Sequence, residues 1–344
     1  MYAAVLEGKG QITYRELPTP QPRAGQEMQR VRAASICGSD LHRFTRGHKV
    51  TPLVLGHEAA GEIVTVGPGV SPGLVGRAAA IIPLVPCFDC AQCQAGRYSA
   101  CKRYSFIGSR QNGGYAEYVE LPERNALLLP PGLSLEAAAL VEPASVARHI
   151  LDLGQFQPGQ SVVVLGAGSI GLMGVQWLRL LGAGLILSSD ISAANRQAAL
   201  ELGADDAIDP LAQDLVQAVQ ARTGAGADLV FETAGVPQTL QQTVRVVRPG
   251  GFVVLAGNQP LDQSLPLSWI EELERGEVHL RGCFMSYSAP FPGHECTDSI
   301  ALAQASRLNL AAMISHRFPL AQAPDVFARM AAHDFAYRKI LLIP

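Results

Sequence analysis

The pattern of hydrophobic and polar positions changes character near Leu153. Before this point, short apolar runs such as EIVTV, which precedes Gly67, and AEYVEL, which follows Gly114, are separated by turns rich in glycine and proline. Many short strands with such punctuation are typical of an irregular β domain. We therefore predict a mostly-β domain in the N-terminal part of the chain.

After Leu153, strand-like and helix-like segments alternate. Apolar runs predict strands at 161–165, 185–189, 227–231, 252–256 and 278–282. Helices are expected at 169–181, 192–202, 211–222, 237–247 and 268–275, and Ser192 is a suitable N-cap for the second of them. Alternation at this spacing predicts βαβ units and a parallel, doubly wound sheet.

The chain of 344 residues is too long for one ordinary hydrophobic core and suits two domains. We expect an α/β protein in which residues 1–150 and 286–344 form the mostly-β domain and residues 151–285 form the doubly wound domain. The last six residues, KILLIP, read as a short strand that rejoins the first domain.

Composition excludes several classes of function. A formal net charge of −3 lacks the basic excess of a nucleic-acid-binding protein. No apolar run approaches the roughly 18 residues of a membrane span. The opening MYAAVLEGKG lacks the basic and apolar regions of a secretory signal. We therefore expect a cytoplasmic protein without nucleic-acid or membrane partners.

Seven cysteines are an odd number for a disulfide scaffold, and a reducing compartment would keep them as thiols that can bind metal. Four of them form the pattern C-x-x-C-x-x-C-x₇-C, at Cys87, Cys90, Cys93 and Cys101. Four thiolates this close can complete a tetrahedral shell around Zn²⁺ with no open position, which predicts a structural zinc site. The alternative is four unrelated buried thiols.

A G-x-G-x-x-G motif directly follows the strand at 161–165 and opens the next helix. Its first glycine makes the turn, its second admits a pyrophosphate, and its third permits close packing of helix on strand. The helix N-terminus then offers N–H groups to phosphate. The residues predicted to bind the cofactor here are Gly166, Gly168, Ser169, Ile170 and Gly171.

Asp190 ends the next predicted strand, about 20 residues beyond these glycines. Its carboxylate can accept hydrogen bonds from a ribose hydroxyl and would repel a 2′-phosphate, so we expect NAD rather than NADP. The alternative is an ordinary glycine turn, with Asp190 capping the following helix.

A second, dispersed set of metal-binding residue types comprises Cys37 and the pair His57-Glu58. Thiolate, imidazole and carboxylate together suit a catalytic zinc that keeps one position open. Spacing alone leaves other interpretations, because a single histidine or cysteine is more often a packed core residue.

The run Gly56-His57-Glu58-x₂-Gly61-x₅-Gly67-x₂-Val70 resembles the signature of zinc-containing medium-chain alcohol dehydrogenases. The four-cysteine segment, the GAGSIG run and the domain order are similar to that family too. The resemblance implies a GroES-like catalytic domain joined to a Rossmann domain, zinc and NAD as cofactors, and a homodimer or homotetramer.

The polyol-oxidising branch of that family, like this chain, has a glutamate where classical members have a second cysteine ligand, here Glu142 in LVEPASV. By that resemblance Cys37 and His57 bind the catalytic zinc, with Glu58 and Glu142 as direct or water-bridged carboxylates; which of the two binds directly stays open. Without the resemblance, Glu142 is simply an acid at a helix entry before Pro143.

The resemblance also implies a catalytic proton relay, in which Ser39 takes the proton of the substrate alcohol and passes it through the cofactor ribose toward His42 and solvent. An unperturbed histidine pKa near 6.5 suits the terminal role. Both residues are otherwise ordinary loop positions.

Several segments, among them PLVPCFDCAQC and YSFIGSRQNGGYAEYV, resemble the branch of the family that acts on a galactitol phosphate. Basic side chains close in sequence to Cys37 suit a phosphate group, because arginine binds phosphate with two parallel hydrogen bonds. The predicted substrate residues are Arg43, Arg46, Lys49 and Arg110. For the basic residues, the alternative is a solvated charged loop. For the substrate, the alternative is a sorbitol-type or threonine-type dehydrogenase. For the zinc chemistry, the alternative is a zinc-free relative that lacks this activity.

Overall fold

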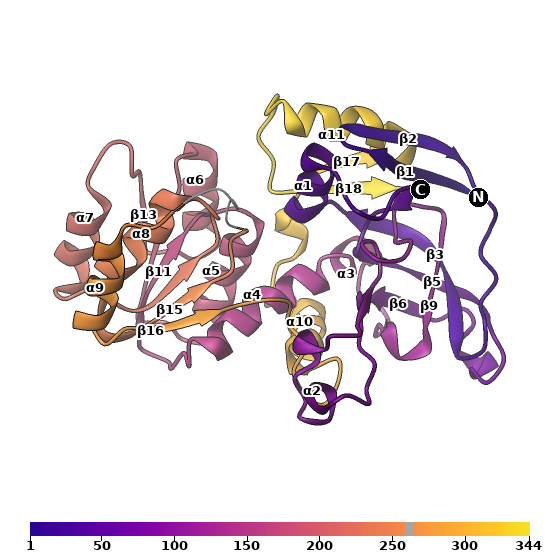
Figure 1. The fold of residues 1–344 in the computed structure, drawn as a ribbon, viewed down its shortest axis with the longest axis horizontal. Coiled ribbons are helices and arrows are strands. Elements are labelled where there is room, and N and C mark those ends of the chain that lie inside the picture. Colours follow the sequence, from indigo (N-terminus) through magenta and orange to yellow (C-terminus); the bar gives the residue numbers. More distant parts are fainter. Residues whose placement is uncertain (259–263) are drawn as a thin grey trace. The chain divides into compact units, whose positions relative to one another are not determined.

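The computed structural model describes residues 1–258 and 264–344. The chain divides into two compact units: Met1–Glu142 with Tyr287–Pro344, and Pro143–Ser286 (Figure 1). No helix in the described part of the chain is long and apolar enough to cross a membrane.

The first unit is built mainly from β strands. A three-stranded sheet has the order β2-β1-β4, from Gln11–Glu16, Tyr2–Gly8 and Leu53–Val54. A seven-stranded sheet runs β10-β6-β5-β3-β18-β17, with β9 also paired to β3. Its strands are β3 (Gln26–Ser35), β5 (Glu58–Val66), β6 (Ala78–Ile81), β9 (Tyr118–Pro122), β10 (Ala126–Leu128), β17 (Ile314–Pro319) and β18 (Lys339–Ile343). A small pair joins β7 (Leu84–Val85) and β8 (Ser105–Phe106).

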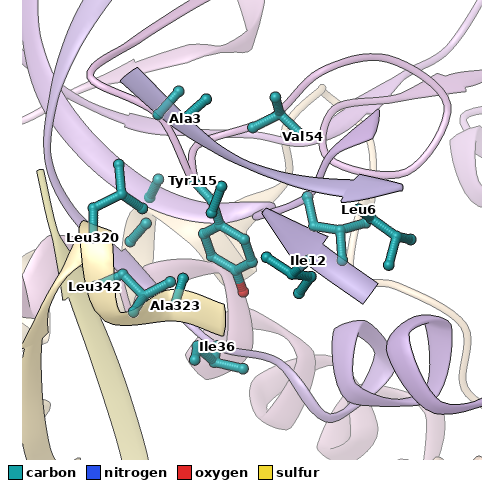
Figure 2. Packing of buried hydrophobic residues seen from close by; sticks show 14 of the residues in the cluster. Ala3, Leu6, Ile12, Ile36, Val54, Tyr115, Leu320, Ala323 and Leu342 are labelled. Atoms are coloured by element: carbon teal, nitrogen blue, oxygen red, sulfur yellow. The ribbon is translucent and has the colours of Figure 1, made fainter. Parts of the chain in front are cut away.

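Helices of the first unit are short and lie between strands. They are α1 (Gly38–Arg46), α2 (Ala91–Gln94), α3 (Leu135–Ala138), α10 (His294–Gln304) and α11 (Ala323–Ala331). Figure 2 shows the apolar core of this unit, where the Tyr115 ring lies among side chains from the start of the chain and from its C-terminal part, including Ile12 and Leu342.

The C-terminal strand rejoins the first unit, which confirms that prediction. In β18, Leu342 pairs antiparallel with Ala34 of β3, and the same strand runs parallel to β17. This pairing brings Lys339 beside residues near the N-terminus, because Ile36 N donates a 2.9 Å hydrogen bond to Ile340 O.

The second unit holds a parallel six-stranded sheet of order β13-β12-β11-β14-β15-β16. The strands are β11 (Ser161–Leu165), β12 (Leu185–Ser189), β13 (Asp206–Ile208), β14 (Ala227–Glu232), β15 (Val247–Leu255) and β16 (His279–Gly282). The strand order reverses direction between β11 and β14, and such a switch point is where doubly wound sheets bind ligands.

Helices cover both faces of this sheet, with α4 and α5 on one side and α7 and α9 on the other (Figure 1). The helices are α4 (Val141–Leu153), α5 (Ser169–Leu180), α6 (Ala193–Glu201), α7 (Leu215–Thr223), α8 (Pro237–Val246) and α9 (Leu267–Arg275). The doubly wound α/β prediction is thus confirmed, and the Ser192 Oγ accepts a capping hydrogen bond from Asn195 N at 3.4 Å.

Two features of the second unit differ from the sequence-based expectation. The three-residue strand β13 has no counterpart there, since its segment DAI is too short and too polar to stand out. The first boundary between units lies at Glu142–Pro143 rather than at residue 150. Helix α4 belongs mostly with the second unit, where the Trp177 indole donates a 2.9 Å hydrogen bond to Ala144 O.

Candidate functional site

Cys37, His57 and Glu58 are brought together by the pairing of β3 with β5. Cys37 is the N-cap of α1, two residues after β3 ends, and Glu58 begins β5 opposite Ser35. One potential ligand atom from each of the three side chains lies within 4.8 Å of the other two. Antiparallel pairing therefore unites residues twenty positions apart in a set of sulfur, nitrogen and oxygen donors that suits zinc.

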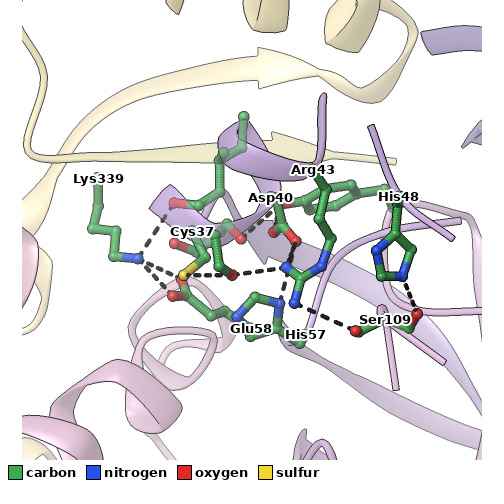
Figure 3. A network of polar contacts seen from close by, with 12 residues as sticks. Cys37, Asp40, Arg43, His48, His57, Glu58, Ser109 and Lys339 are labelled. Atoms are coloured by element: carbon green, nitrogen blue, oxygen red, sulfur yellow. Dashed lines mark hydrogen bonds and ion pairs between the residues drawn. The ribbon is translucent and has the colours of Figure 1, made fainter. Parts of the chain in front are cut away.

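Buried charges surround this cluster (Figure 3). Lys339 Nζ donates hydrogen bonds of 2.7 and 2.6 Å to the two carboxylate oxygens of Glu58, and both side chains are almost fully buried. Burial raises the pKa of the nearby Glu142 carboxyl to about 7. Glu58 thus has Lys339 as its cationic partner, whereas the carboxyl group of Glu142 titrates near pH 7.

Asp40 occupies the far side of the His57 ring. Its Oδ1 lies 3.4 Å from His57 Nδ1, and burial opposes but does not overcome the Asp40 and Cys37 charges that raise the pKa of His57 well above its usual value. The surroundings of the His57 ring therefore favour a positive charge at the imidazole, which a proton or a bound metal ion can supply.

The two predicted relay residues lie on α1. Ser39 Oγ donates to Cys37 Sγ at 3.3 Å. His42 is half-buried, and burial together with Arg46 and Arg43 lowers its pKa. At neutral pH the imidazole is therefore mostly uncharged and able to accept a proton.

The four basic residues predicted to bind phosphate have different surroundings. Arg43 is part of the buried network: it donates hydrogen bonds to Ser39 Oγ at 2.8 Å, to Asp40 Oδ1 at 3.1 Å and to Ser109 Oγ at 3.3 Å. Arg46 and Lys49 are exposed, and Arg110 is exposed and stacks on Tyr104, 3.7 Å from the ring centroid. The structure thus separates Arg43 from the other three.

Three residues of this site carried no recognised signal in the sequence: Asp40, Tyr115 and Lys339. Asp40 directly follows Ser39 and could have been found as the usual acidic partner of a metal-bound histidine. Lys339 is 281 positions from Glu58, so no local pattern could link them.

The four-cysteine lobe has the geometry of a tetrahedral metal site. All four sulfurs lie within 4.8 Å of one another, with Cys87–Cys93 at 3.9 Å, Cys90–Cys101 at 4.0 Å and Cys87–Cys101 at 3.5 Å. A Zn–S bond of about 2.3 Å gives tetrahedral S···S edges of about 3.8 Å, whereas a disulfide needs about 2.05 Å. The lobe therefore fits Zn²⁺ held by four thiolates.

The glycine turn after β11 matches the roles expected of its residues. Gly166 has φ +95°, and a Cβ at Gly171 would lie 1.9 Å from Gly166 O. A Cβ at Gly168 would meet nothing within 4 Å, so the space above this glycine, at the start of α5, is open to a phosphate.

Beside this turn lies a cavity of about 460 Å³ within the second unit. It is lined by Gly166, Gly168, Asp190, Asn195 and Thr233, among others. Asp190 accepts hydrogen bonds from Ala167 N and Ser192 N, both at 2.8 Å, and from Asn195 Nδ2 at 3.3 Å. A carboxylate accepts about four hydrogen bonds, so Asp190 can brace the turn and still accept one from a ligand.

Comparisons with known proteins agree with this architecture. The model of the alcohol dehydrogenase GroES-like domain matches residues 24–131, and that of the zinc-binding dehydrogenases matches residues 169–302. Galactitol 1-phosphate 5-dehydrogenase of Escherichia coli is 34% identical over all of both chains. Sorbitol dehydrogenase of Bacillus subtilis is 31% identical over 100% of this chain and 97% of the relative. L-threonine 3-dehydrogenase of Symbiobacterium thermophilum is 32% identical over 98% and 96%.

Solved structures show the same likeness. Galactitol-1-phosphate dehydrogenase of Escherichia coli superposes with a TM-score of 0.95 at 33% identity, covering both chains fully. A zinc-binding dehydrogenase of Sinorhizobium meliloti with bound NADP gives 0.92 at 34% identity, covering 100% of this chain and 99% of that one. An Escherichia coli alcohol dehydrogenase with bound NADH gives 0.91 at 28% identity, with the same coverage.

This chain is similar over its full length to enzymes of one family. It also has the Cys37–His57–Glu58 cluster, the four-sulfur lobe and the glycine turn. The chain belongs to the zinc-type medium-chain alcohol and polyol dehydrogenases, which are nicotinamide-dependent oxidoreductases.

Proposed function

We propose that this enzyme oxidises a secondary alcohol group of a phosphorylated polyol, with galactitol 1-phosphate as the favoured substrate and NAD as the hydride acceptor. The observation that carries the proposal is the Cys37–His57–Glu58 cluster, in which Cys37 is partly exposed and the other two side chains are buried. The similarity to galactitol 1-phosphate 5-dehydrogenase over the whole chain supports the choice of substrate.

In this proposal the catalytic zinc is held by Cys37 and His57, with Glu58 or Glu142 as the carboxylate. The donor set, the 4.8 Å grouping and the negative surroundings of His57 fit a divalent cation. When bound there, zinc would act as a Lewis acid on the alcohol oxygen and lower its pKa. A second zinc in the lobe of Cys87, Cys90, Cys93 and Cys101 would be structural.

The protein groups of the relay handle the alcohol proton. Ser39 Oγ donates to Cys37 Sγ and accepts from Arg43, which leaves one lone pair for the alcohol proton. As Ser39 takes that proton, it releases its own hydroxyl proton to the next group of the relay. Arg43 donates to the same oxygen and cannot accept a proton, so it is not the next member of the relay. The proton that Ser39 gives up would pass through the cofactor ribose toward His42, which lies further along α1. The lowered pKa of His42 suits a group that receives a proton and releases it to solvent.

NAD is favoured over NADP by the charge of Asp190. Its carboxylate lies on the wall of the cavity beside Gly166 and Gly168, at the end of β12. Arg196, the nearby cation, is engaged by Asp190 O, Ile191 O and the carboxylate of Asp209. A 2′-phosphate would therefore meet a negative charge without a free cationic partner in this network.

We propose Arg46, Lys49 and Arg110 as the phosphate-binding residues of the substrate site. All three are exposed, whereas Arg43 already has three partners in the buried network. Replacing Arg43 would disturb Asp40 and Ser39 as well as any phosphate contact. Arg46→Ala is therefore the cleaner probe.

The deciding experiment compares kcat/KM for galactitol 1-phosphate, galactitol, sorbitol and L-threonine, in the wild-type enzyme and in Arg46→Ala, Lys49→Ala and Arg110→Ala. If one of these residues binds the phosphate group, its replacement should lower kcat/KM for the phosphorylated substrate. The expected loss is equivalent to about 1.5–3 kcal/mol, the range for a charged hydrogen bond. The values for the unphosphorylated polyols should stay unchanged in that variant.

A sorbitol-type or threonine-type dehydrogenase is the second candidate, and the similarity to both kinds of relative favours it. These enzymes would share every metal and cofactor residue named above. Turnover of sorbitol or threonine that equals that of galactitol 1-phosphate would replace the phosphate assignment with this candidate.

We also propose that the enzyme is a homodimer or homotetramer. Strand β16 ends the order of the six-stranded sheet, all four of its residues are exposed, and Phe284 just beyond it is 60% exposed. An unpaired edge beside exposed apolar side chains suits pairing with a second copy. Sedimentation of Leu280→Lys and Phe284→Asp variants as monomers would support this assembly.

A further inference from the structure

Tyr115 is fully buried beside the Cys37–His57–Glu58 cluster, and the proposed reaction does not use it. Its ring packs in the apolar core of the first unit, 6.0 Å from the Phe327 ring, and its hydroxyl points toward Ile36, the neighbour of Cys37 (Figure 2). A buried phenol needs a hydrogen-bond partner. The identity of that partner connects Tyr115 to the metal-binding residues.

The Tyr115 hydroxyl donates a 2.7 Å hydrogen bond to Asp40 Oδ2 and lies 3.2 Å from Ser35 O. The other oxygen of the same carboxylate, Oδ1, accepts from Arg43 at 3.1 Å and faces His57 Nδ1 at 3.4 Å. Asp40 therefore joins the phenol to the imidazole, and the two hydrogen-bonded oxygens fix the orientation of its carboxylate plane.

The ring of Tyr115 also restrains the backbone that precedes His57. Gly56 has φ +94°, and a Cβ built there would lie 2.5 Å from Tyr115 Cδ1. Tyr115 N donates to Leu55 O at 3.0 Å, and Gly114 N donates to Gly56 O at 2.7 Å. Tyr115 thus acts on His57 indirectly from two directions, through the preceding glycine and through Asp40.

We propose that Tyr115 is a positioning residue for zinc binding, which acts through Asp40 to hold the His57 ring with its Nε2 directed toward Cys37 and Glu58. The inference rests on the proposed catalytic zinc. Asp40 Oδ1 selects the tautomer that carries its proton on Nδ1, and the Tyr115 hydroxyl keeps that oxygen in place. Without the hydroxyl, Asp40 can rotate, and the imidazole loses its fixed orientation.

The test is Tyr115→Phe, which retains the ring and removes only the hydroxyl. The zinc affinity of the site that Cys37→Ala abolishes is measured by competition with a chromophoric chelator, in the full-length enzyme without substrate. Asp40→Asn should weaken it by about 10–100-fold, the range for partners of zinc-bound histidines, and Tyr115→Phe by about 10-fold. The double variant should bind zinc no more weakly than Asp40→Asn alone, because the two residues act in series.

Tyr118→Phe is the matched control, since its hydroxyl accepts a 3.1 Å hydrogen bond from Arg30 and Tyr118 does not belong to the metal-binding cluster. With Co²⁺ in the Cys37 site and zinc in the cysteine lobe, the visible absorption spectrum should change in Tyr115→Phe and stay unchanged in Tyr118→Phe. An unchanged affinity and spectrum in Tyr115→Phe would overturn the proposal, as would an equal loss of zinc from both sites. Because no substrate is involved, these results are independent of whether the polyol assignment holds.

Discussion

At the scale of single residues, two of the buried carboxylates of the first unit, Glu58 and Glu27, have opposite kinds of hydrogen-bond partner. The Glu58 carboxylate accepts hydrogen bonds of 2.6 and 2.7 Å from Lys339 Nζ. Glu27 of β3 has no cationic partner among the residues that the structure describes: burial raises its pKa to about 7, and Gln29 Nε2 donates to its Oε1 at 2.9 Å. Glu27 Oε2 and Gln29 Oε1 are buried without a hydrogen-bond partner. If Glu27 is protonated on Oε2, its O–H can donate to Gln29 Oε1, and both oxygens are then satisfied.

Replacing Glu27 by glutamine should therefore remove a pH dependence of stability. The folded-state pKa of about 7 exceeds the ordinary 4.5, so the folded protein binds more protons and its free energy of unfolding falls as pH rises from about 4.5 to 7. Glu27→Gln mimics the protonated acid, so it should be about 2–3 kcal/mol more stable than wild type at pH 8, and nearly equal to it at pH 5. Urea unfolding at the two pH values measures this, and parallel pH profiles would contradict it.

The site residues that could be predicted from the sequence are those in a specific motif or at short spacing. The residues that the sequence did not indicate are those that come to the site from distant parts of the chain. Cys37, His57 and Glu58 were found through such a motif, and the structure brings them together. Lys339 and Tyr115 reach the same site from distant strands and loops. The burial of Glu27 was equally hidden, because its neighbours Gln26 and Gln29 read as a polar surface.

At the scale of elements, the four-cysteine lobe holds only two short helical turns and no regular sheet of its own beyond β7 and β8. Such a segment has little hydrophobic core, and sulfur–metal bonds must supply its stability. Three sulfur–sulfur distances of 3.5, 3.9 and 4.0 Å are close to the edges of a tetrahedral zinc site.

Cys90→Ser should therefore lose one zinc per chain and destabilise the enzyme by about 3 kcal/mol or more, while leaving the KM for the alcohol near the wild-type value in the fraction that stays folded. Zinc analysis and thermal unfolding measure these effects. Cys283→Ser is the matched control, because Cys283 lies outside the four-sulfur group and should retain both zinc ions. A Cys90→Ser enzyme with one zinc lost and full stability would argue against a structural role.

The glycine turn was the most predictable element, because each glycine has a separate steric reason that the motif encodes. The structure shows these reasons as a positive φ at Gly166, open space at Gly168 and contact at Gly171. Strand β13 was unpredictable because three residues give no usable period, and it forms where β12 offers a pairing edge.

Asp190→Ala should lower kcat/KM for NAD about 10-fold or more and leave that for NADP unchanged or higher, since a charged hydrogen bond to ribose and the repulsion of phosphate are both removed. Steady-state kinetics with both cofactors test this. Asp214→Ala, which alters a helix cap away from the cavity, provides the control. The same cofactor ratio in Asp190→Ala and wild type would show that Asp190 does not contact the ribose.

At the scale of the whole molecule, the chain leaves its first unit after Glu142 and returns to it at Tyr287. The hydrophobic pattern indicated both transitions because the first unit has short apolar runs between turns, whereas in the second unit strand-like and helix-like segments alternate. The first transition was placed too late, since helix α4 continues across it and its apolar residues do not distinguish the units. The return of the C-terminal strand matters for chemistry, because β18 delivers Lys339 to Glu58.

The most direct test of the account is a joint measurement of zinc content and alcohol-dependent NADH formation in the wild-type enzyme and in Cys37→Ala. We predict about two zinc ions per wild-type chain and one in a folded Cys37→Ala chain. Turnover of the polyol substrate in that variant should fall by at least about a thousand-fold, since a Lewis acid contributes several kcal/mol to the reaction. Wild-type enzyme that turns over without zinc, or a Cys37→Ala variant that keeps both zinc ions and its activity, would contradict the account.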